Sequence, residues 1–172
     1  MSNDRATLGA TCLEEIRAGF SAYKSLGDKA LAQLSDAEMH WKPDSESNSV
    51  AVIVMHVSGN LLSRWTDFLT TDGEKAWRNR DGEFEEPEGR GKAELLGKWE
   101  AGWACLFSAL DTIEQDALQR TVLIRGEPHT VLKALVRGLT HCAYHVGQIV
   151  FIAKSIRSEE WKSLSVPRNR AR

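Results

Sequence analysis

Residues 131–154 read VLKALVRGLTHCAYHVGQIVFIAK, and this stretch determines how the rest of the chain is interpreted. Apolar residues recur every three or four positions along it, the period of a helix with one buried face. A second face carries polar side chains instead. The stretch therefore predicts a long helix, from Val131 to about Ile156, with two unlike faces. The apolar face holds Leu135, Leu139, Cys142, Val146 and Ile149, and the polar face holds Arg137, His141, His145 and Gln148.

The polar face contains two histidines four residues apart, His141 and His145. Residues at this spacing leave the same side of a helix, with Cβ atoms about 5–6 Å apart, so both imidazoles can reach one metal ion. The same spacing also arises by chance among scattered histidines. A third ligand is needed before a metal site becomes the better interpretation.

Three further segments have helical character. The first runs from about Ala6 to Leu26 and is expected to end at the Gly27-Asp28 pair. The second runs from about Asn48 to Leu69, where the length favours a helix although the first residues are β-branched. Residues 92–115 form the third, with leucines and tryptophans along one side. Together with 131–156 they predict an all-α protein, a four-helix bundle in one domain spanning 1–172.

The connecting segments differ in character. Ser35 and Glu38 have the spacing of a capping box, which predicts one short helical turn. Residues 70–91 form a long charged loop between the second and third helices, and loops of this length are usually functional covers or disordered. Two short extended pieces surround Arg125-Gly126 and suggest a small hairpin, with Thr130 as the cap of the last helix.

Bulk properties exclude several partners. A formal net charge of −2 leaves no basic excess for nucleic acid, and the longest apolar run, VAVIVM at 50–55, is too short to span a bilayer. The first residues, MSNDRATLGATCLEE, lack the basic start and apolar core of a signal peptide. Three cysteines stand apart from one another. We therefore expect a cytoplasmic protein that binds neither nucleic acid nor membrane.

The second helix supplies the missing ligand. Besides an ordinary apolar stripe it has a face that carries His56, Asn60 and Arg64. If this face meets the polar face of the last helix, His56, His141 and His145 share an internal pocket. Three neutral imidazoles suit zinc, nickel, iron or copper and leave a coordination position free for water or substrate.

With these residues in place, the chain resembles the DinB-like superfamily of four-helix metal-binding proteins, and within it an uncharacterised bacterial branch, DUF1572-like. The runs that carry the resemblance are NSVAVIVMHVSGNLLSRWTDFLTTDGEKAWRNRDGEF at 48–84, THCAYHVGQIVFIAK at 140–154 and WKSLSVP at 161–167. The resemblance implies an up-down-down-up bundle, often paired as a homodimer. It also implies that His56, His141 and His145 are the metal ligands.

The resemblance does not supply a reaction. Some relatives are transferases or isomerases that use a low-molecular-weight thiol such as bacillithiol, mycothiol or glutathione. One hypothesis is therefore a metal-dependent enzyme, a thiol S-transferase acting on small electrophiles, or else a hydrolase if water takes the place of the thiol. The absence of Asp and Glu from the two histidine faces favours thiol transfer. The other hypothesis is a stress-related dimeric protein that binds metal without turnover. No catalytic residue can be named from the sequence.

Three residues are candidates for contacts with substrate or cofactor in the pocket. Asn60 and Gln148 could orient an imidazole or bind the ligand. Arg64 could bind an anionic group, or form a salt bridge with the acidic loop. The 70–91 loop is expected to lie near the mouth of the histidine pocket.

The remaining histidines and one cysteine are given other roles. His40 and His129 fall in connectors and are expected at the surface or the rim of the pocket. Cys142 adjoins His141 but points about 100° away on a helix, so it is expected in the core rather than as a nucleophile.

Overall fold

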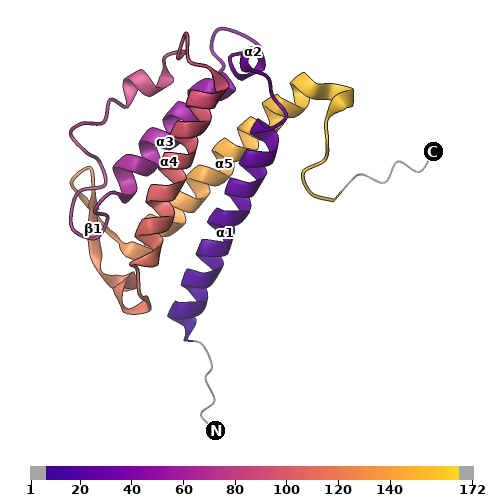
Figure 1. The fold of residues 1–172 in the computed structure, drawn as a ribbon. Helices are drawn as coiled ribbons and strands as arrows, with labels where there is room; N and C mark the ends of the chain where they lie inside the picture. Colours follow the sequence, from indigo (N-terminus) through magenta and orange to yellow (C-terminus); the bar gives the residue numbers. More distant parts are fainter. Residues whose placement is uncertain (1–6, 167–172) are drawn as a thin grey trace.

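The computed structural model describes residues 7–166 and is mainly helical (Figure 1), as predicted. The expected helix start at Ala6 and the last residue of the 161–167 run, Pro167, lie outside this range, as do both ends of the predicted 1–172 domain. Among residues 7–166, no helix is both long and apolar enough to cross a membrane. The five α-helices of this part of the chain are α1 (Leu8–Leu31), α2 (Asp36–Met39), α3 (Val50–Trp65), α4 (Lys92–Asp111) and α5 (Val131–Arg157).

Serine or threonine residues cap the N-termini of four of these helices. The side chains of Thr7, Ser49 and Thr130 each accept a hydrogen bond from the backbone N–H three residues later, at the starts of α1, α3 and α5. These bonds satisfy N–H groups that have no partner inside the helix. At α2, Ser35 and Glu38 form both bonds of the predicted capping box.

Helix α1 does not end at Gly27-Asp28, so that prediction is wrong. The helix continues to Leu31 because tertiary packing outweighs the low helix propensity of this pair. A Cβ atom at Gly27 would lie 2.7 Å from Cζ2 of Trp99, so glycine lets the indole pack directly against the backbone. Asp28 then accepts a 2.8 Å hydrogen bond from Trp99 Nε1.

Helices α3 and α4 are shorter than predicted. The expected second helix, 48–69, begins at Val50 and ends at Trp65, after which Asp67 adopts a left-handed conformation with φ 48°. A non-glycine residue in this region stops a right-handed helix. The expected third helix, 92–115, ends at Asp111.

The four long helices pack chiefly in two pairs, α1 with α5 and α3 with α4, and α3 also contacts α5. Aromatic rings join the pairs, since Phe20 of α1 meets Trp65 of α3 and Trp103 of α4 edge-on, with centroids 6.1 and 6.4 Å apart. At the α3–α4 contact a Cβ on Gly102 would lie 3.0 Å from the Cα of Ser58. Glycine thus allows the two backbones to approach closely.

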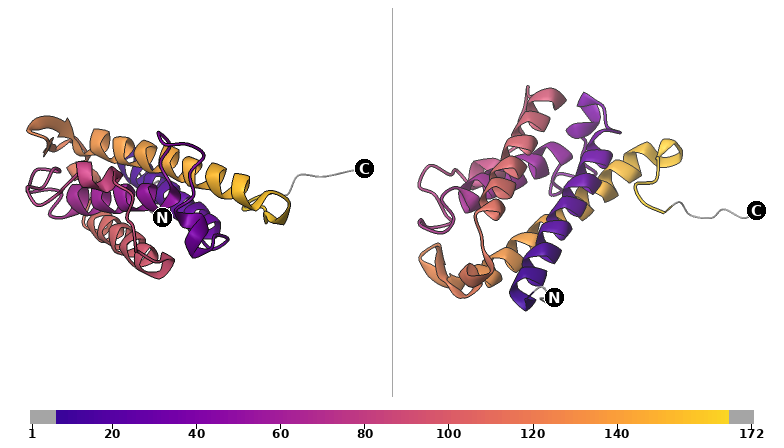
Figure 2. Two further views of the ribbon diagram at one scale, coloured as in Figure 1. Left: turned by 90° about the horizontal axis from the view of Figure 1, so that it is seen from above. Right: turned by 60° about the horizontal axis from the view of Figure 1, so that its bottom comes forward.

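The predicted hairpin is present between α4 and α5. Strands β1 (Thr121–Ile124) and β2 (Glu127–Thr130) pair antiparallel across a two-residue turn in which Arg125 and Gly126 both have positive φ. The carboxylate of Asp72, from the loop between α3 and α4, accepts hydrogen bonds from both turn N–H groups at 2.8 and 2.7 Å. Loop and hairpin therefore lie side by side at one end of the helices (Figure 2).

Candidate metal centre

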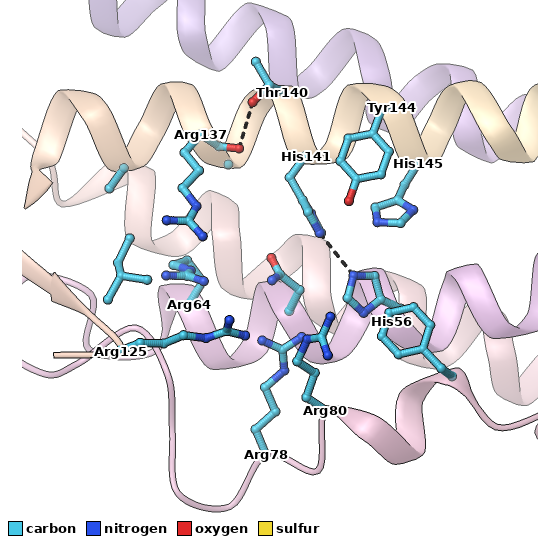
Figure 3. Close-up of a pocket in the computed structure, with 15 residues that line it drawn as sticks. His56, Arg64, Arg78, Arg80, Arg125, Arg137, Thr140, His141, Tyr144 and His145 are labelled. Atoms are coloured by element: carbon cyan, nitrogen blue, oxygen red, sulfur yellow. Dashed lines mark hydrogen bonds between the residues drawn. The ribbon is translucent and has the colours of Figure 1, made fainter. Parts of the chain in front are cut away.

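The structure brings together the three histidines that the sequence singled out. His56 lies in the middle of α3, and His141 and His145 lie on consecutive turns of α5. One ring nitrogen from each residue lies within 4.8 Å of the others. Nε2 of His56 is 3.1 Å from Nε2 of His141, and the dashed line in Figure 3 marks this pair. The polar faces of α3 and α5 do face each other.

A carboxylate approaches the cluster from the loop between α3 and α4. Glu83 lies in the 3-10 helix η1 (Asp81–Phe84), and its Oε2 is 2.9 Å from Nδ1 of His56. Its other contacts are with Arg78, whose Nε and Nη2 each lie 2.7 Å from a carboxylate oxygen. The periodicity of the two helices predicted no acidic residue near the histidines, because Glu83 lies in the irregular segment between α3 and α4.

Burial and hydrogen bonding act oppositely on the Glu83 carboxyl. Burial favours the neutral acid, but the bonds from Arg78 and His56 outweigh it, so the pKa of Glu83 is lowered. The group is a carboxylate at neutral pH and can only accept. It therefore fixes the hydrogen of His56 on Nδ1 and leaves the lone pair of Nε2 facing the other two histidines.

A second hydrogen bond fixes the tautomer of His145 in the same way. Its Nδ1 is 2.9 Å from Oε1 of Gln148, an oxygen that can only accept. The hydrogen of His145 is therefore on Nδ1, and its buried Nε2 has no hydrogen-bond partner among residues 7–166. Two of the three imidazoles thus present unprotonated Nε2 atoms to one point, the arrangement seen when outer hydrogen bonds orient metal-binding histidines.

The two histidines of α5 stay neutral at physiological pH. Burial, followed by the nearby charges of the other two histidines, lowers the pKa of His141 to about 3. Burial and His56 lower the pKa of His145 to about 4. Neutral imidazole is the form that binds metal. These three residues could therefore hold a divalent ion, and the orphaned Nε2 of His145 is an observation that fits one.

A pocket of about 380 Å³ opens beside the cluster. This volume suits a small molecule. Its wall includes His56, His141 and His145, and it also includes Arg78, Arg80 and Phe84. The last three belong to the 70–91 loop, so the expectation that this loop lies near the mouth of the pocket is confirmed.

The three predicted contact residues occupy different places. Asn60 and Arg64 line the pocket, with Arg64 only 7% exposed. The alternative salt bridge from Arg64 to the acidic loop does not form among the described residues. Gln148 is not part of the pocket wall; it contacts His145 from the outside. Tyr144, which sequence reasoning passed over, lies beside His145 at the pocket (Figure 3).

The other candidates lie away from the cluster. Cys142 is fully buried, and burial raises the pKa of its thiol to about 12, so it is a core residue as predicted. His40 contacts Glu86 and the carbonyl of Arg90. His129 was expected at the surface or the rim of the pocket; it is not at the surface, and it contacts Arg137, which lines the pocket. It is 6% exposed, because the second strand turns its side chain inward against α5.

The fold and this site define a mainly helical protein whose three-histidine cluster could hold a metal ion. A family model matches residues 7–170, and the chain belongs to that family, which is described as "Protein of unknown function (DUF1572)". A search of curated proteins finds no match.

Proposed function

We propose that this protein is a metal-dependent enzyme of the DinB-like superfamily, with an up-down-down-up bundle, that transfers a small-molecule thiol to an electrophile. The observation that carries the proposal is the convergence of three imidazoles on the wall of a 380 Å³ pocket, two of them with their free Nε2 atoms set by outer hydrogen bonds. A divalent ion held there would lower the pKa of a thiol or water in its open coordination position. Zinc, nickel and iron all suit this donor set.

The proposed reaction is a substitution at carbon. The thiol loses its proton to solvent, its sulfur forms a bond to an electrophilic carbon, and the bond from that carbon to a halide or epoxide oxygen breaks with both electrons going to the leaving atom. Tyr144 lines the pocket, and its ring centroid lies 4.1 Å from the ring centroid of His145. Burial raises the pKa of Tyr144, so its hydroxyl is protonated at neutral pH and can donate to a leaving oxygen.

The state of Glu83 favours thiol transfer over hydrolysis. Hydrolysis benefits from a carboxylate that accepts the proton of water. Glu83 is the carboxylate that contacts the histidines, but its oxygens are already bonded to His56 and Arg78, and the residue is 7% exposed. It orients His56 rather than acting on a substrate.

Two measurements test the proposal. Metal analysis of protein purified without a histidine tag should find about one divalent ion per chain. Glutathione, bacillithiol and mycothiol are then each combined with halogenated and epoxide acceptors, and thioether formation is followed by mass spectrometry. Turnover in the wild type that is lost in His56→Ala supports the proposal. Bound metal without turnover in any combination would instead favour a metal-binding protein with no catalytic activity.

Localisation and assembly belong to the same proposal. Cys12, Cys105 and Cys142 are free thiols, which fits a reducing cytoplasm.

Helix α5 exposes Tyr144 and Phe151, 53% and 73% accessible, and such exposed aromatic residues suit a contact between two copies of the chain. We propose a homodimer that uses this face, and size-exclusion chromatography with light scattering on Phe151→Ser would test it.

A further inference from the structure

The end of the pocket away from the histidine cluster is lined by arginines. Arg64, Arg125 and Arg137 lie together on one side of the histidine cluster, and Arg137 on α5 points across the pocket toward Arg64 on α3 (Figure 3). Arg64 is two helical turns from His56, about 12 Å along α3, and Arg137 is one turn from His141, about 6 Å along α5. One small molecule can therefore reach both ends of the pocket.

Carboxylates neutralise some of the arginines that line this pocket. Arg78 forms two bonds with Glu83, Arg125 lies 3.2 Å from Glu74, and Arg80 pairs with Asp81. Each of these positive charges already has a partner from the chain.

Arg64 and Arg137 have no such partner. Within residues 7–166, no carboxylate forms a salt bridge with either guanidinium group. Arg64 is 93% buried, and its Nη1 is fully enclosed without a hydrogen bond. Burial and the nearby charge of Arg137 lower the pKa of Arg64 to about 10, which still leaves it charged at neutral pH. A buried cation without a counterion is costly, and such sites are usually completed by a bound anion.

The position of Arg137 is set by a buried neighbour. Nδ1 of His129 is 3.0 Å from the carbonyl oxygen of Glu127, which can only accept, so the hydrogen of His129 is on Nδ1. The free Nε2 then accepts a hydrogen bond from Nη1 of Arg137 at 3.3 Å. This bond explains why a histidine is buried in β2, and it directs the guanidinium group of Arg137 without neutralising it.

We propose that Arg64 and Arg137 form an oxyanion subsite that binds a phosphoryl or phosphonyl group of a small-molecule substrate. Two uncompensated positive charges match a group that carries two negative charges, and guanidinium forks bind its oxygens in pairs. The rest of the substrate extends about 6–12 Å toward the histidines. This inference rests on the proposed function for the placement of the reacting atom, but the subsite itself consists of residues that do not bind the metal.

Calorimetry with inorganic phosphate tests the subsite in the metal-free full-length protein, so that phosphate cannot bind to the metal. We expect binding in the wild type and in His141→Ala. Arg64→Met and Arg137→Gln should each weaken it by about tenfold or more, the effect of losing a charge-assisted hydrogen bond. Arg137 is exposed, so its replacement should leave folding intact. Acetate should bind much more weakly than phosphate.

Arg80→Gln is the matched control, because Arg80 lines the same pocket but is paired with Asp81. We expect it to change phosphate affinity by less than about threefold, as for other exposed ion pairs. An equal loss in Arg80→Gln, an unchanged affinity in Arg64→Met, or acetate binding as tight as phosphate would each overturn the subsite.

The stability of the Arg64 variant gives a second measurement. Without phosphate, Arg64→Met should melt at a higher temperature than the wild type, since an apolar side chain replaces a buried unpaired charge. With phosphate, the wild type should gain more stability than the variant. Metal content is measured on each protein as purified, before the metal is removed for calorimetry. A full complement of divalent metal as purified, with no effect of Arg64→Met on phosphate binding, would refute the subsite alone. Phosphate binding to a wild type that contains no divalent metal as purified would refute the proposed function alone.

Discussion

Oε2 of Glu83 lies 2.9 Å from Nδ1 of His56, and this contact joins the loop between α3 and α4 to the candidate metal centre. The same carboxylate is held by Arg78, another loop residue. The orientation of a helical histidine therefore depends on a segment that has no regular secondary structure beyond one 3-10 turn. Changes in this loop should therefore alter the orientation of His56.

Replacement of Glu83 by Gln should weaken metal binding by about 10- to 100-fold, the usual cost of losing an outer partner of a ligand. The amide can no longer favour the Nδ1–H tautomer of His56 by its charge. Competition with a chelating dye measures the affinity. Glu86→Gln is the control, because Glu86 makes a similar contact with His40, at 2.7 Å, away from the cluster. Equal losses in both variants would contradict a specific role for Glu83.

A substitution on α3 should have the same effect by displacing Glu83. A Cβ atom at Gly59 would lie 2.1 Å from Oε1 of Glu83 and 2.7 Å from its Cδ. Gly59→Ala should therefore push the carboxylate away from His56 and lower metal affinity, even though alanine is the better helix former. Unchanged affinity in Gly59→Ala would show that the carboxylate can move without loss to His56.

Each of the single replacements His56→Ala, His141→Ala and His145→Ala should abolish stoichiometric metal binding, because two imidazoles hold a divalent ion poorly against water. Folding should persist, since the core is built from apolar residues such as Leu61 and Val146 that do not depend on the ion. His129→Ala should keep full metal. Elemental analysis and circular dichroism on the four variants provide the measurement. Full metal in His56→Ala would show that the third ligand lies elsewhere.

The metal-free protein should lose stability as the pH falls from about 6.5 to 4. Unfolded histidines have the ordinary pKa of 6.5, whereas His141 and His145 have pKa values of about 3 and 4 in the folded chain. In this window the unfolded chain binds more protons, so acid lowers the free energy of unfolding by up to about 1.4 kcal/mol per pH unit for each residue. Urea titrations at several pH values measure the slope.

The double variant His141→Ala/His145→Ala is the reference for that experiment. The opposite contribution of His40, whose pKa is raised despite its burial by bonds to Glu86 and Arg90, is common to both proteins and cancels. The variant should show a clearly smaller slope between pH 6.5 and 4.5. An identical slope would assign the acid sensitivity to other groups.

Two glycines of α4 should respond to alanine in opposite directions. Gly102 faces the backbone of α3, where an added Cβ would lie 3.0 Å from the Cα of Ser58, so Gly102→Ala should destabilise the fold by about 1–3 kcal/mol. Gly97 has open space around it, and Gly97→Ala should stabilise by about 0.5–1 kcal/mol. Urea denaturation compares the two. Stabilisation by Gly102→Ala would mean that α3 and α4 separate easily.

The features that depend on helical periodicity could be predicted from the amino-acid sequence alone. Every imidazole ring of the cluster comes from a helix. Residues four positions apart, such as His141 and His145, lie on the same face of any α-helix. The polar face of α3 could be matched to them because both helices repeat with the same period. The capping box at Ser35 and the hairpin turn at Arg125-Gly126 were also predictable, since each depends on neighbours a few residues away.

The features in which an irregular segment meets a helix depend on long-range packing and became visible in the folded chain. Glu83 could not be placed from the sequence, because the loop has no period that predicts which side chains point inward. The continuation of α1 past Gly27 likewise depends on a distant partner, Trp99. Such contacts join residues far apart in the chain, and their free energies exceed the local preferences on which sequence reasoning relies.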